Sequence, residues 1–421
     1  MQFPPTHSRR AALALFAAGG LAACSGGPGR FATGPADEAP GTDYRPVPNP
    51  GFDAWVASFR NRAQGAGISE ATLGRALRDV GFLPDVIERD RNQAEVQRSL
   101  QDYLALAVDD DRVSNGRAAL RRHDATLSAI EARYGVEKEV VTAIWGVESR
   151  YGKRRGDIPV VSALATLAYD GRRGGFFEKQ LIAALRILQN GDITVDRMTG
   201  SWAGAMGHTQ FIPTSYQAYA VDFTGDGRRD IWSEDPTDAL ASTAAYLQNS
   251  GWRRGQLWGV EVTVPAGFDA GQAGRGRNRS VADWQAQGVR PAAGGALPDH
   301  GPAAILLPAG PSGPGFLTFR NFGVIARYNN ADKYVIAVGH LADRIAGAGP
   351  LRGTFPPDAQ GLTLADRKEL QRRLTAAGFD TDGTDGVVGP DTIAAIEAYE
   401  RANGLPVTGT ATRALLQRLR G

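Results

Sequence analysis

The sequence has a single cysteine, Cys24, among its 421 residues. One thiol cannot form a disulfide within the chain, so a fold held together by internal disulfides is excluded. Long apolar runs are missing as well. The longest run, near the N-terminus, covers about 13 residues, which is too short for a permanent transmembrane helix.

An excess of charge of one sign is also absent. The chain has 47 Lys and Arg against 45 Asp and Glu, a formal net charge of +2. There is no strongly basic block of the kind that nucleic-acid binding needs, so we expect no nucleic-acid partner. Hydrophobic content of 42% and charged content of 22% are ordinary for a soluble globular protein. The length allows two to four domains.

The N-terminus has the pattern of an export signal. Arg9 and Arg10 precede an apolar run, and Leu-Ala-Ala-Cys24 closes it, so we expect a signal peptide over residues 1–23. The Leu-Ala-Ala-Cys sequence resembles the lipobox of bacterial lipoproteins, which implies a lipid on Cys24 and a periplasmic protein anchored in the outer membrane. The alternative is an ordinary buried cysteine. Ser8-Arg9-Arg10 resembles a twin-arginine signal, which leaves the export route open. Residues 24–49, rich in Gly, Pro and Ala, predict a flexible tether.

Helical spacing of apolar residues dominates the chain up to residue 190. It predicts helices over Phe52 to Phe59, Ile68 to Val80, Val96 to Leu106, Arg112 to Tyr134, Val160 to Tyr169 and Phe177 to Gln189. Later, Val260 to Val264, Ala304 to Pro308 and Phe316 to Phe319 are short β-prone runs. They predict a small β-containing insertion over about 253–320. Helix returns from Asn321 to His340.

Glu148 is the candidate catalytic residue. Apolar residues from Val140 to Val147 recur at helical spacing, which places Glu148 in the last turn beside the buried face, with Gly152 as a stop. A carboxyl group in an apolar setting stays protonated more easily, and it can then act as a general acid. The alternative is a solvated surface charge near a helix end.

Two further stretches have the composition of a binding site. Arg172 and Arg173 lie in a Gly-rich break between aromatic residues, where they could hold a carboxylated or acetylated polymer, or simply be solvated charges. From Ser201 to Tyr216, small residues allow close backbone approach. Gln210 in this run offers one acceptor and two donors to a sugar hydroxyl or amide. Tight helix packing is the alternative for this run.

Residues 222–232 place oxygen side chains at alternate positions, with glycine where a calcium loop turns sharply. The first half fits an EF-hand-like loop. Position twelve, however, is Ser233 where a bidentate Glu is expected, so Glu234, Asp235 or Asp238 would have to serve. An Asx-rich turn without an ion is the alternative.

Four of these motifs together resemble the membrane-bound lytic transglycosylase B family of bacterial cell-wall enzymes. They are Glu148 to Gly152, Ala203 to Phe211, the Asp222 loop and Asn321 to Tyr334. The resemblance covers roughly residues 52–347. It implies a mainly helical, lysozyme-like core that cleaves the MurNAc-GlcNAc β-1,4 bond of peptidoglycan without water and leaves 1,6-anhydro-muramoyl ends.

The resemblance also implies roles for individual residues. Glu148 matches the single catalytic acid and base. The residues that match the lining of the glycan cleft are Arg172, Arg173, Ser201, Gln210, Tyr246, Tyr328 and Tyr334. The residues that match a calcium site are Asp222, Thr224, Asp226, Arg228 through its carbonyl, and Asp238. Calcium would be structural, and no cofactor is required for the reaction. Judged alone, Tyr328 and Tyr334 are more often core aromatics, whereas the resemblance favours stacking of their rings on sugars.

After the Gly/Pro-rich linker 351–361, residues 362–421 predict a separate three-helix unit. The segment from Asp385 to Thr392 and its echo from Leu405 to Thr412 resemble the peptidoglycan-binding module of many wall enzymes. The alternative is a helix-capping turn with Asp391 or Thr392 as N-cap. The expected architecture is therefore mainly α (α+β), with a catalytic domain over residues 50–350 and this module.

The chemistry explains why one carboxylate is enough. Most glycosidases use two, but no second acid near Glu148 has a comparably apolar setting, and Asp170 is the nearest candidate. The sugar's own C6 hydroxyl can attack C1 once deprotonated Glu148 accepts its proton. The alternatives are a hydrolytic muramidase and a non-catalytic wall-binding lipoprotein. Expected partners are glycan strands, the membrane through the lipid, and other cell-wall enzymes.

Overall fold

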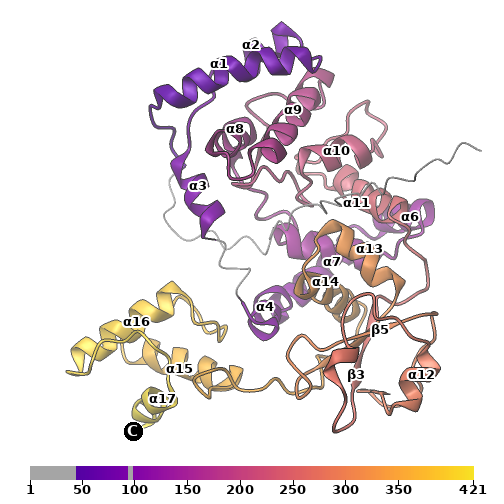
Figure 1. Cartoon of the computed structure of the whole chain (residues 1–421), viewed down its shortest axis with the longest axis vertical. Helices are drawn as coiled ribbons and strands as arrows, with labels where there is room; N and C mark the ends of the chain where they lie inside the picture. The colour runs from indigo at the N-terminus through magenta and orange to yellow at the C-terminus, as the bar shows by residue number, and fades with distance from the viewer. Residues whose placement is uncertain (1–43, 93–97) are drawn as a thin grey trace, which may run out of the picture. The chain divides into compact units, whose positions relative to one another are not determined.

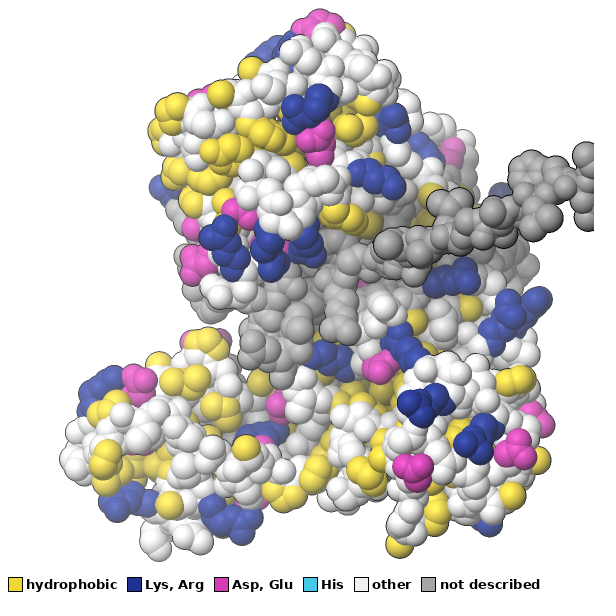
Figure 2. Space-filling model, in the orientation of Figure 1, with side chains coloured by type: hydrophobic (Ala, Val, Ile, Leu, Met, Phe, Trp, Pro, Cys, Tyr) yellow, Lys and Arg dark blue, Asp and Glu magenta, His cyan; other side chains and the backbone are white. Residues whose placement is uncertain are grey.

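The structure is a computed structural model, and it describes residues 44–92 and 98–421. The predicted signal peptide, Cys24 and the tether as far as residue 43 lie outside the described residues. Within the described ranges, no helix is both long enough and apolar enough to cross a membrane. On the face drawn in Figure 2, basic and acidic side chains of the described residues are interspersed.

The first part of the chain is helical, as the spacing predicts. One contact falls inside the predicted tether, where Val47 N donates to Phe82 O over 3.0 Å. Side chains of Asn49, Ser69, Ser99 and Asp109 accept hydrogen bonds from the first turns of four helices and so fix where these begin. The helices are α1 (Pro50–Gly65), α2 (Glu70–Ala76), α3 (Pro84–Arg91), α4 (Leu100–Ala107), α5 (Asp110–Arg122) and α6 (Asp124–Tyr134).

The prediction of one long helix from Arg112 to Tyr134 was wrong, because the chain breaks at His123. Its N–H closes the last turn of α5 on Ala119 O, while its own carbonyl accepts the first hydrogen bond of α6, from Leu127 over 2.8 Å. The backbone at His123 leaves the helical region, with φ −109° and ψ 21°. The apolar spacing runs on through this change of direction, so the pattern could not reveal it.

The middle of the chain surrounds one buried helix, α7 (Lys138–Ser149). Every residue of α7 from Val140 to Ser149 is buried, and α5, α11 and α14 pack against it. Figure 1 shows α7 in the interior, with α14 beside it. The other elements of this part are β1 (Ile158–Pro159), α8 (Val160–Asp170), α9 (Gly174–Asn190), β2 (Thr199–Gly200), α10 (Pro213–Tyr219) and α11 (Thr237–Asn249).

The predicted insertion is a four-stranded antiparallel sheet with strand order β4-β3-β6-β5. Val260 of β3 and Ile305 of β5 both pair with Leu317 of β6. The sheet has its own apolar cluster, in which Trp284 is fully buried and donates its indole N–H to Ala303 O. The elements are β3 (Gly259–Thr263), the 3-10 turn η2 (Ala270–Gln272), α12 (Val281–Ala286), β4 (Arg290–Pro291), β5 (Ala304–Leu306) and β6 (Gly315–Thr318).

The return to helix after the sheet is also broken, which corrects the single helix predicted from Asn321 to His340. The chain forms α13 (Arg320–Tyr328) and α14 (Asp332–Ile345). Between them Asn329 is extended, with φ −143°, and its side chain accepts a hydrogen bond from Ala331 N over 3.1 Å. An asparagine that bonds its own backbone competes with the helix, which is the physical reason for the break.

The C-terminal segment forms α15 (Leu364–Ala376), α16 (Pro390–Ala402) and α17 (Arg413–Arg420) around a third apolar cluster. The proposed N-caps of α16 were wrong. Gly389 is the N-cap, and Pro390 occupies the first helical position. Thr392 is buried and accepts a hydrogen bond from Gln371 Nε2 over 3.1 Å. The Asp/Gly-rich loop is therefore held to α15 by side chains rather than by a cap.

Candidate active site

Glu148 lies in the last turn of α7, where the sequence placed it, and only 2% of it is exposed. Tyr334, in the first turn of α14, donates its hydroxyl to Glu148 Oε1 over 2.6 Å. Burial and the negative charge of Glu148 raise the pKa of Tyr334 well above its usual value, so the phenol keeps its proton. The carboxyl group is thus desolvated and held in one orientation by a phenol from another helix.

The backbone after Glu148 turns abruptly. Arg150 and Tyr151 both have positive φ, 51° and 60°, and Gly152 follows with φ 83°. The helix therefore ends at Ser149, three residues before the predicted stop. Tyr151 folds back against α7, and its hydroxyl donates to Arg112 O over 2.7 Å. A Cβ on Gly146 would lie 2.5 Å from that hydroxyl oxygen, so the packing requires glycine there.

The other buried acids of the described chain have structural partners. Four acidic residues are buried there: Asp90, Glu148, Asp238 and Glu400. Asp90 pairs with arginines, Asp238 accepts backbone hydrogen bonds, and Glu400 binds Thr408 and Gly409 in the C-terminal unit. Asp170, the nearest second acid by sequence, pairs with Arg91 Nη2 over 2.6 Å.

Ser201 and Gln210 lie on a tight turn held by its own hydrogen bonds. Ser201 Oγ accepts from Ala205 N over 3.1 Å, and Met206 pairs with Phe211. Gln210 has a positive φ of 54° and is 9% exposed. Its amide nitrogen donates to Gly207 O and Arg155 O, at 2.9 and 3.0 Å. The donors are therefore engaged, which leaves the amide oxygen as the atom that can accept a bond from a sugar hydroxyl.

Tyr246 and Tyr328 form an aromatic cluster with Phe211, next to Gln210. The two tyrosine rings have centroids 4.9 Å apart. Tyr246 donates its hydroxyl to Arg327 O and Tyr328 to Thr209 O, each over 2.5 Å. Both hydroxyls are thus bound to backbone carbonyls. Glu148 is close enough to Tyr328 for its charge to help raise the pKa of that phenol, although burial is the larger cause.

Arg172 and Arg173 lie between α8 and α9, and both bind one carboxylate from α3. Arg172 Nε is 2.7 Å from Asp90 Oδ2, and Arg173 Nη2 pairs with Asp90 Oδ1. Burial acts to raise the pKa of Asp90, but the two guanidinium groups lower it on balance. The arginine side chains stay 47% and 24% exposed. Their contacts tie them to α3 rather than to the Glu148 cluster.

Asp90 is the residue that sequence reasoning missed. It follows Glu88 and Arg89 in a strongly charged helix, where nothing distinguishes it from a surface residue. Its partner lies 82 positions later in the chain. No local pattern reports such a contact, and two adjacent arginines after Asp170-Gly171 are the only available hint that a buried acid is needed.

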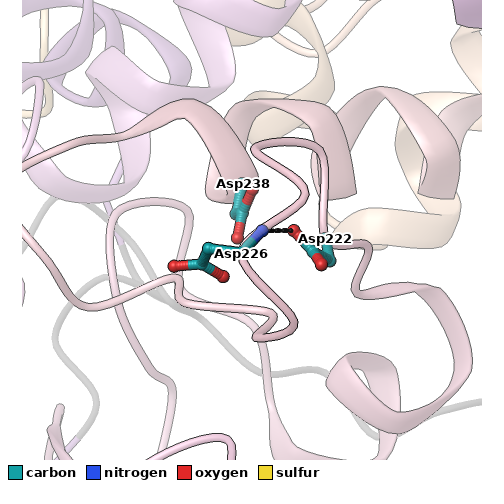
Figure 3. A group of neighbouring side chains, drawn as sticks. All are labelled: Asp222, Asp226 and Asp238. Atoms are coloured by element: carbon teal, nitrogen blue, oxygen red, sulfur yellow. Dashed lines mark hydrogen bonds between the residues drawn. The ribbon is translucent and has the colours of Figure 1, made fainter.

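The acidic loop brings three of the predicted calcium ligands together. One carboxylate oxygen each of Asp222, Asp226 and Asp238 lies within 4.8 Å of the other two, and Figure 3 shows these side chains around the loop. Gly225 and Gly227 have φ of 78° and 86°, which lets the loop turn around Asp222. Asp222 Oδ1 accepts from Gly225 N over 2.6 Å and from Thr224 Oγ1 over 3.2 Å.

Of the three acids considered for the last position, Asp238 is the one whose carboxylate lies near those of Asp222 and Asp226. Asp238 is buried at the start of α11 and accepts from Phe223 N and Asp230 N, at 2.9 and 3.0 Å. Glu234 instead pairs with Arg155, and Asp235 accepts from Thr237 N. Burial raises the pKa of Asp238. An oxygen-rich set containing a desolvated carboxylate suits a hard cation such as Ca²⁺, and the Arg228 carbonyl belongs to the same loop.

A family model described as "Transglycosylase SLT domain" matches residues 51–343. The chain belongs to this family. A second model, described as "Putative peptidoglycan binding domain", matches residues 363–419 of this transglycosylase-family protein. The two matches cover the helical core with its sheet and the C-terminal three-helix unit. The mainly helical class with a lysozyme-like SLT core is thus confirmed.

Among proteins similar to this SLT-family chain is the membrane-bound lytic murein transglycosylase B of Escherichia coli, 33% identical over 251 residues. The match covers 58% of this chain and 66% of that relative, just under two thirds of its length. Two solved structures are also similar. SltB3 of Pseudomonas aeruginosa, in complex with NAG-NAM-pentapeptide, is 47% identical, with a TM-score of 0.71 over 88% of this chain and 100% of that one. The Escherichia coli transglycosylase Slt35, in complex with calcium, is 30% identical, with a TM-score of 0.60 over 71% and 93%.

Proposed function

We propose that the chain is a lytic transglycosylase of peptidoglycan that uses Glu148 as its acid and base. Glu148 gives its proton to the glycosidic oxygen as the bond from C1 of MurNAc to O4 of GlcNAc breaks. The carboxylate then accepts the proton of the MurNAc C6 hydroxyl while O6 bonds to C1. Glu148 returns to its protonated form, and no water is consumed.

The observation that supports this proposal is the setting of Glu148, buried and bound by Tyr334 while the other buried acids serve structure. Burial favours the neutral acid before the first step, and the phenol hydrogen bond stabilises the anion that remains after it. A hydrolase with two carboxylates would need a second acid held against the same sugar. Asp170 does not fit that part, because it pairs with Arg91.

The remaining predicted cleft residues fall into two groups in this proposal. Tyr246 and Tyr328 pack on Phe211, and Ser201 and Gln210 belong to the turn that leads to Phe211. In the proposal these four residues hold and distort a sugar ring at Glu148. Arg172 and Arg173 form a separate basic pair that suits a carboxylate of the peptide attached to MurNAc, because guanidinium groups bind carboxylates well. The complex of the similar SltB3 with NAG-NAM-pentapeptide is consistent with such a substrate.

Calcium at Asp222, Thr224, Asp226, the Arg228 carbonyl and Asp238 is part of the proposal. The ion would be structural, because it would join the loop to the start of α11 rather than to Glu148. The clustered oxygens support it, as does the calcium complex of the similar Slt35.

We further propose that the C-terminal unit binds glycan strands and that the protein is anchored in the outer membrane through lipidated Cys24, facing the periplasm. A tethered binding module raises the local concentration of substrate at the active site. Anchoring rests on the Leu-Ala-Ala-Cys sequence. Metabolic labelling with a palmitate analogue tests it, since Cys24→Ser is expected to abolish the label.

Digestion of isolated sacculi tests the reaction. Wild-type protein is expected to release muropeptides with anhydro ends, and Glu148→Gln, which keeps the shape and the acceptor for Tyr334, is expected to release none. Products that carry one added water would instead show a muramidase. Release that is unchanged in Glu148→Gln would rule out Glu148 as the acid.

A further inference from the structure

His208 lies on the turn that carries Gln210, and only 3% of it is exposed. Trp145 Nε1 donates to His208 Nδ1 over 3.1 Å, and His208 Nε2 lies 2.7 Å from Ser233 O. Trp145 belongs to α7, three residues before Glu148. The imidazole therefore joins the helix of the proposed acid to the segment that follows the acidic loop.

These two contacts determine the tautomer of the ring. An indole N–H only donates, so Nδ1 must carry a lone pair, and a carbonyl only accepts, so Nε2 must carry the hydrogen. The opposite tautomer would make both contacts repulsive. It would satisfy only the approach of Arg155 Nη1 to Nε2 at 3.2 Å, and that guanidinium already donates to Ser233 O over 2.9 Å. The neutral ring with hydrogen on Nε2 fits the site.

The backbone of His208 extends the same connection. Its carbonyl accepts from Ser149 Oγ over 2.5 Å, and its N–H donates to Ile231 O over 3.1 Å. Ser149 is the neighbour of Glu148 and also accepts from Gly152 N over 2.9 Å. A Cβ on Gly152 would lie 2.5 Å from His208 Nδ1, so the turn after α7 packs directly on the ring.

The charged groups that face the ring are Arg155, Glu234 and Asp230. Burial lowers the pKa of His208, and the positive charge of Arg155 lowers it further. The hydrogen bond to Ser233 O and the two acids act in the other direction, and the net shift is downward. A protonated ring would direct a second N–H at the indole N–H and would bring a positive charge beside Arg155.

We propose that His208 is a positioning residue that keeps Glu148 and Gln210 in register only while its ring is neutral with hydrogen on Nε2. Protonation of the ring would separate α7 from the Ser233 segment and stop the reaction in acid. This inference rests on the proposed transglycosylase reaction, although the state of the ring can be measured without it.

Nitrogen-15 NMR of the full chain with labelled histidine tests the ring directly. At pH 7, the spectrum is expected to show His208 Nδ1 unprotonated and hydrogen-bonded and Nε2 protonated, with titration only below the ordinary histidine pKa. Hydrogen on Nδ1, or a cationic ring at neutral pH, would overturn the proposal. The His208→Gln variant, which lacks the imidazole signals, identifies them.

The pH profile of sacculus digestion tests the consequence. Trp145→Phe removes the N–H that keeps Nδ1 unprotonated, so the acid limb is expected to move to higher pH. His208→Gln can still donate toward Ser233 and cannot titrate, so that limb is expected to disappear while kcat at neutral pH falls about threefold to tenfold, the effect of one buried hydrogen bond. The matched control is His123→Gln, because the ring centroids of His123 and Trp145 lie 5.5 Å apart. This variant is expected to leave the acid limb in place.

An acid limb unmoved in both Trp145→Phe and His208→Gln would overturn the role of His208. If neither variant folds, the NMR measurement decides alone, with the His208 signals identified as those that remain when the other four histidines are replaced by Gln. Failure of the proposed reaction is distinguishable, because wild-type protein would then release products with an added water while the state of the ring stayed measurable.

Discussion

Tyr334→Phe isolates the contribution of one hydroxyl to the reacting carboxyl group. Tyr334 is completely buried, and its hydroxyl donates to Glu148 Oε1 over 2.6 Å. Phenylalanine keeps the ring and its packing. A hydrogen bond to a charged group is worth about 1.5–3 kcal/mol, so kcat is expected to fall about 10- to 100-fold. KM is expected to change little, because the lost bond orients the acid rather than the sugar.

The assay is steady-state release of anhydro-muropeptides from sacculi at pH 7, with thermal unfolding measured on the same samples. The matched control is Tyr216→Phe, because Tyr216 is equally buried but donates to the backbone oxygen of Arg229 over 2.7 Å. We expect that control to keep its kcat. A wild-type kcat in Tyr334→Phe, or a change confined to KM, would refute the role given to this hydroxyl.

Three further predictions concern other sites. Calcium at 100 times its Kd is expected to stabilise wild-type protein by about 2.7 kcal/mol, and Asp238→Asn to reduce that gain; a chelator that leaves the melting temperature unchanged would contradict the calcium site. Asp90→Asn removes the carboxylate that pairs with two arginines. KM for peptide-bearing glycan is therefore expected to rise by a factor several times larger than the factor by which kcat falls. KM values that are the same for bare and peptide-bearing strands, in wild type and in the variant, would contradict a role of the arginines in binding the peptide. Burial raises the pKa of Asp343 from 3.8 to about 6 despite its bond from Trp258, so the folded state holds this proton more tightly and loses stability as pH rises from about 4 to 6. At about 1.4 kcal/mol per unit, Asp343→Asn is expected to gain about 3 kcal/mol over wild type between pH 3.5 and pH 7, and parallel stability curves for the two proteins would disprove this.

Local spacing predicted the existence of most elements but not their ends. The burial of Glu148 followed from the apolar residues before it, since one helix repeat determines its own buried face. The helix breaks at His123 and Asn329 were not predicted, because each changes the direction of the chain without interrupting the periodic spacing of apolar residues. Side-chain and backbone hydrogen bonds at those two residues, rather than hydrophobicity, decide where these helices end.

For the site, too, the sequence predicted the residues better than their contacts. Gln210, Tyr328 and Tyr334 were identified through motifs. The partners of the two tyrosines, Thr209 O and Glu148, belong to distant segments, and Gln210 binds Arg155 O as well as the nearby Gly207 O. The hydrogen bond from the Tyr328 hydroxyl to Thr209 O and the pairing of Arg172 with Asp90 each join residues that are far apart in the sequence. Such pairs are determined by the packing of distant segments, which no short stretch of the sequence specifies.

The most direct test of the central claim is mass spectrometry of muropeptides that the purified protein releases in water enriched in oxygen-18. Since Glu148 serves as acid and then as base for the sugar's own C6 hydroxyl, anhydro ends without the label are expected. Reducing ends that carry one labelled oxygen would contradict it.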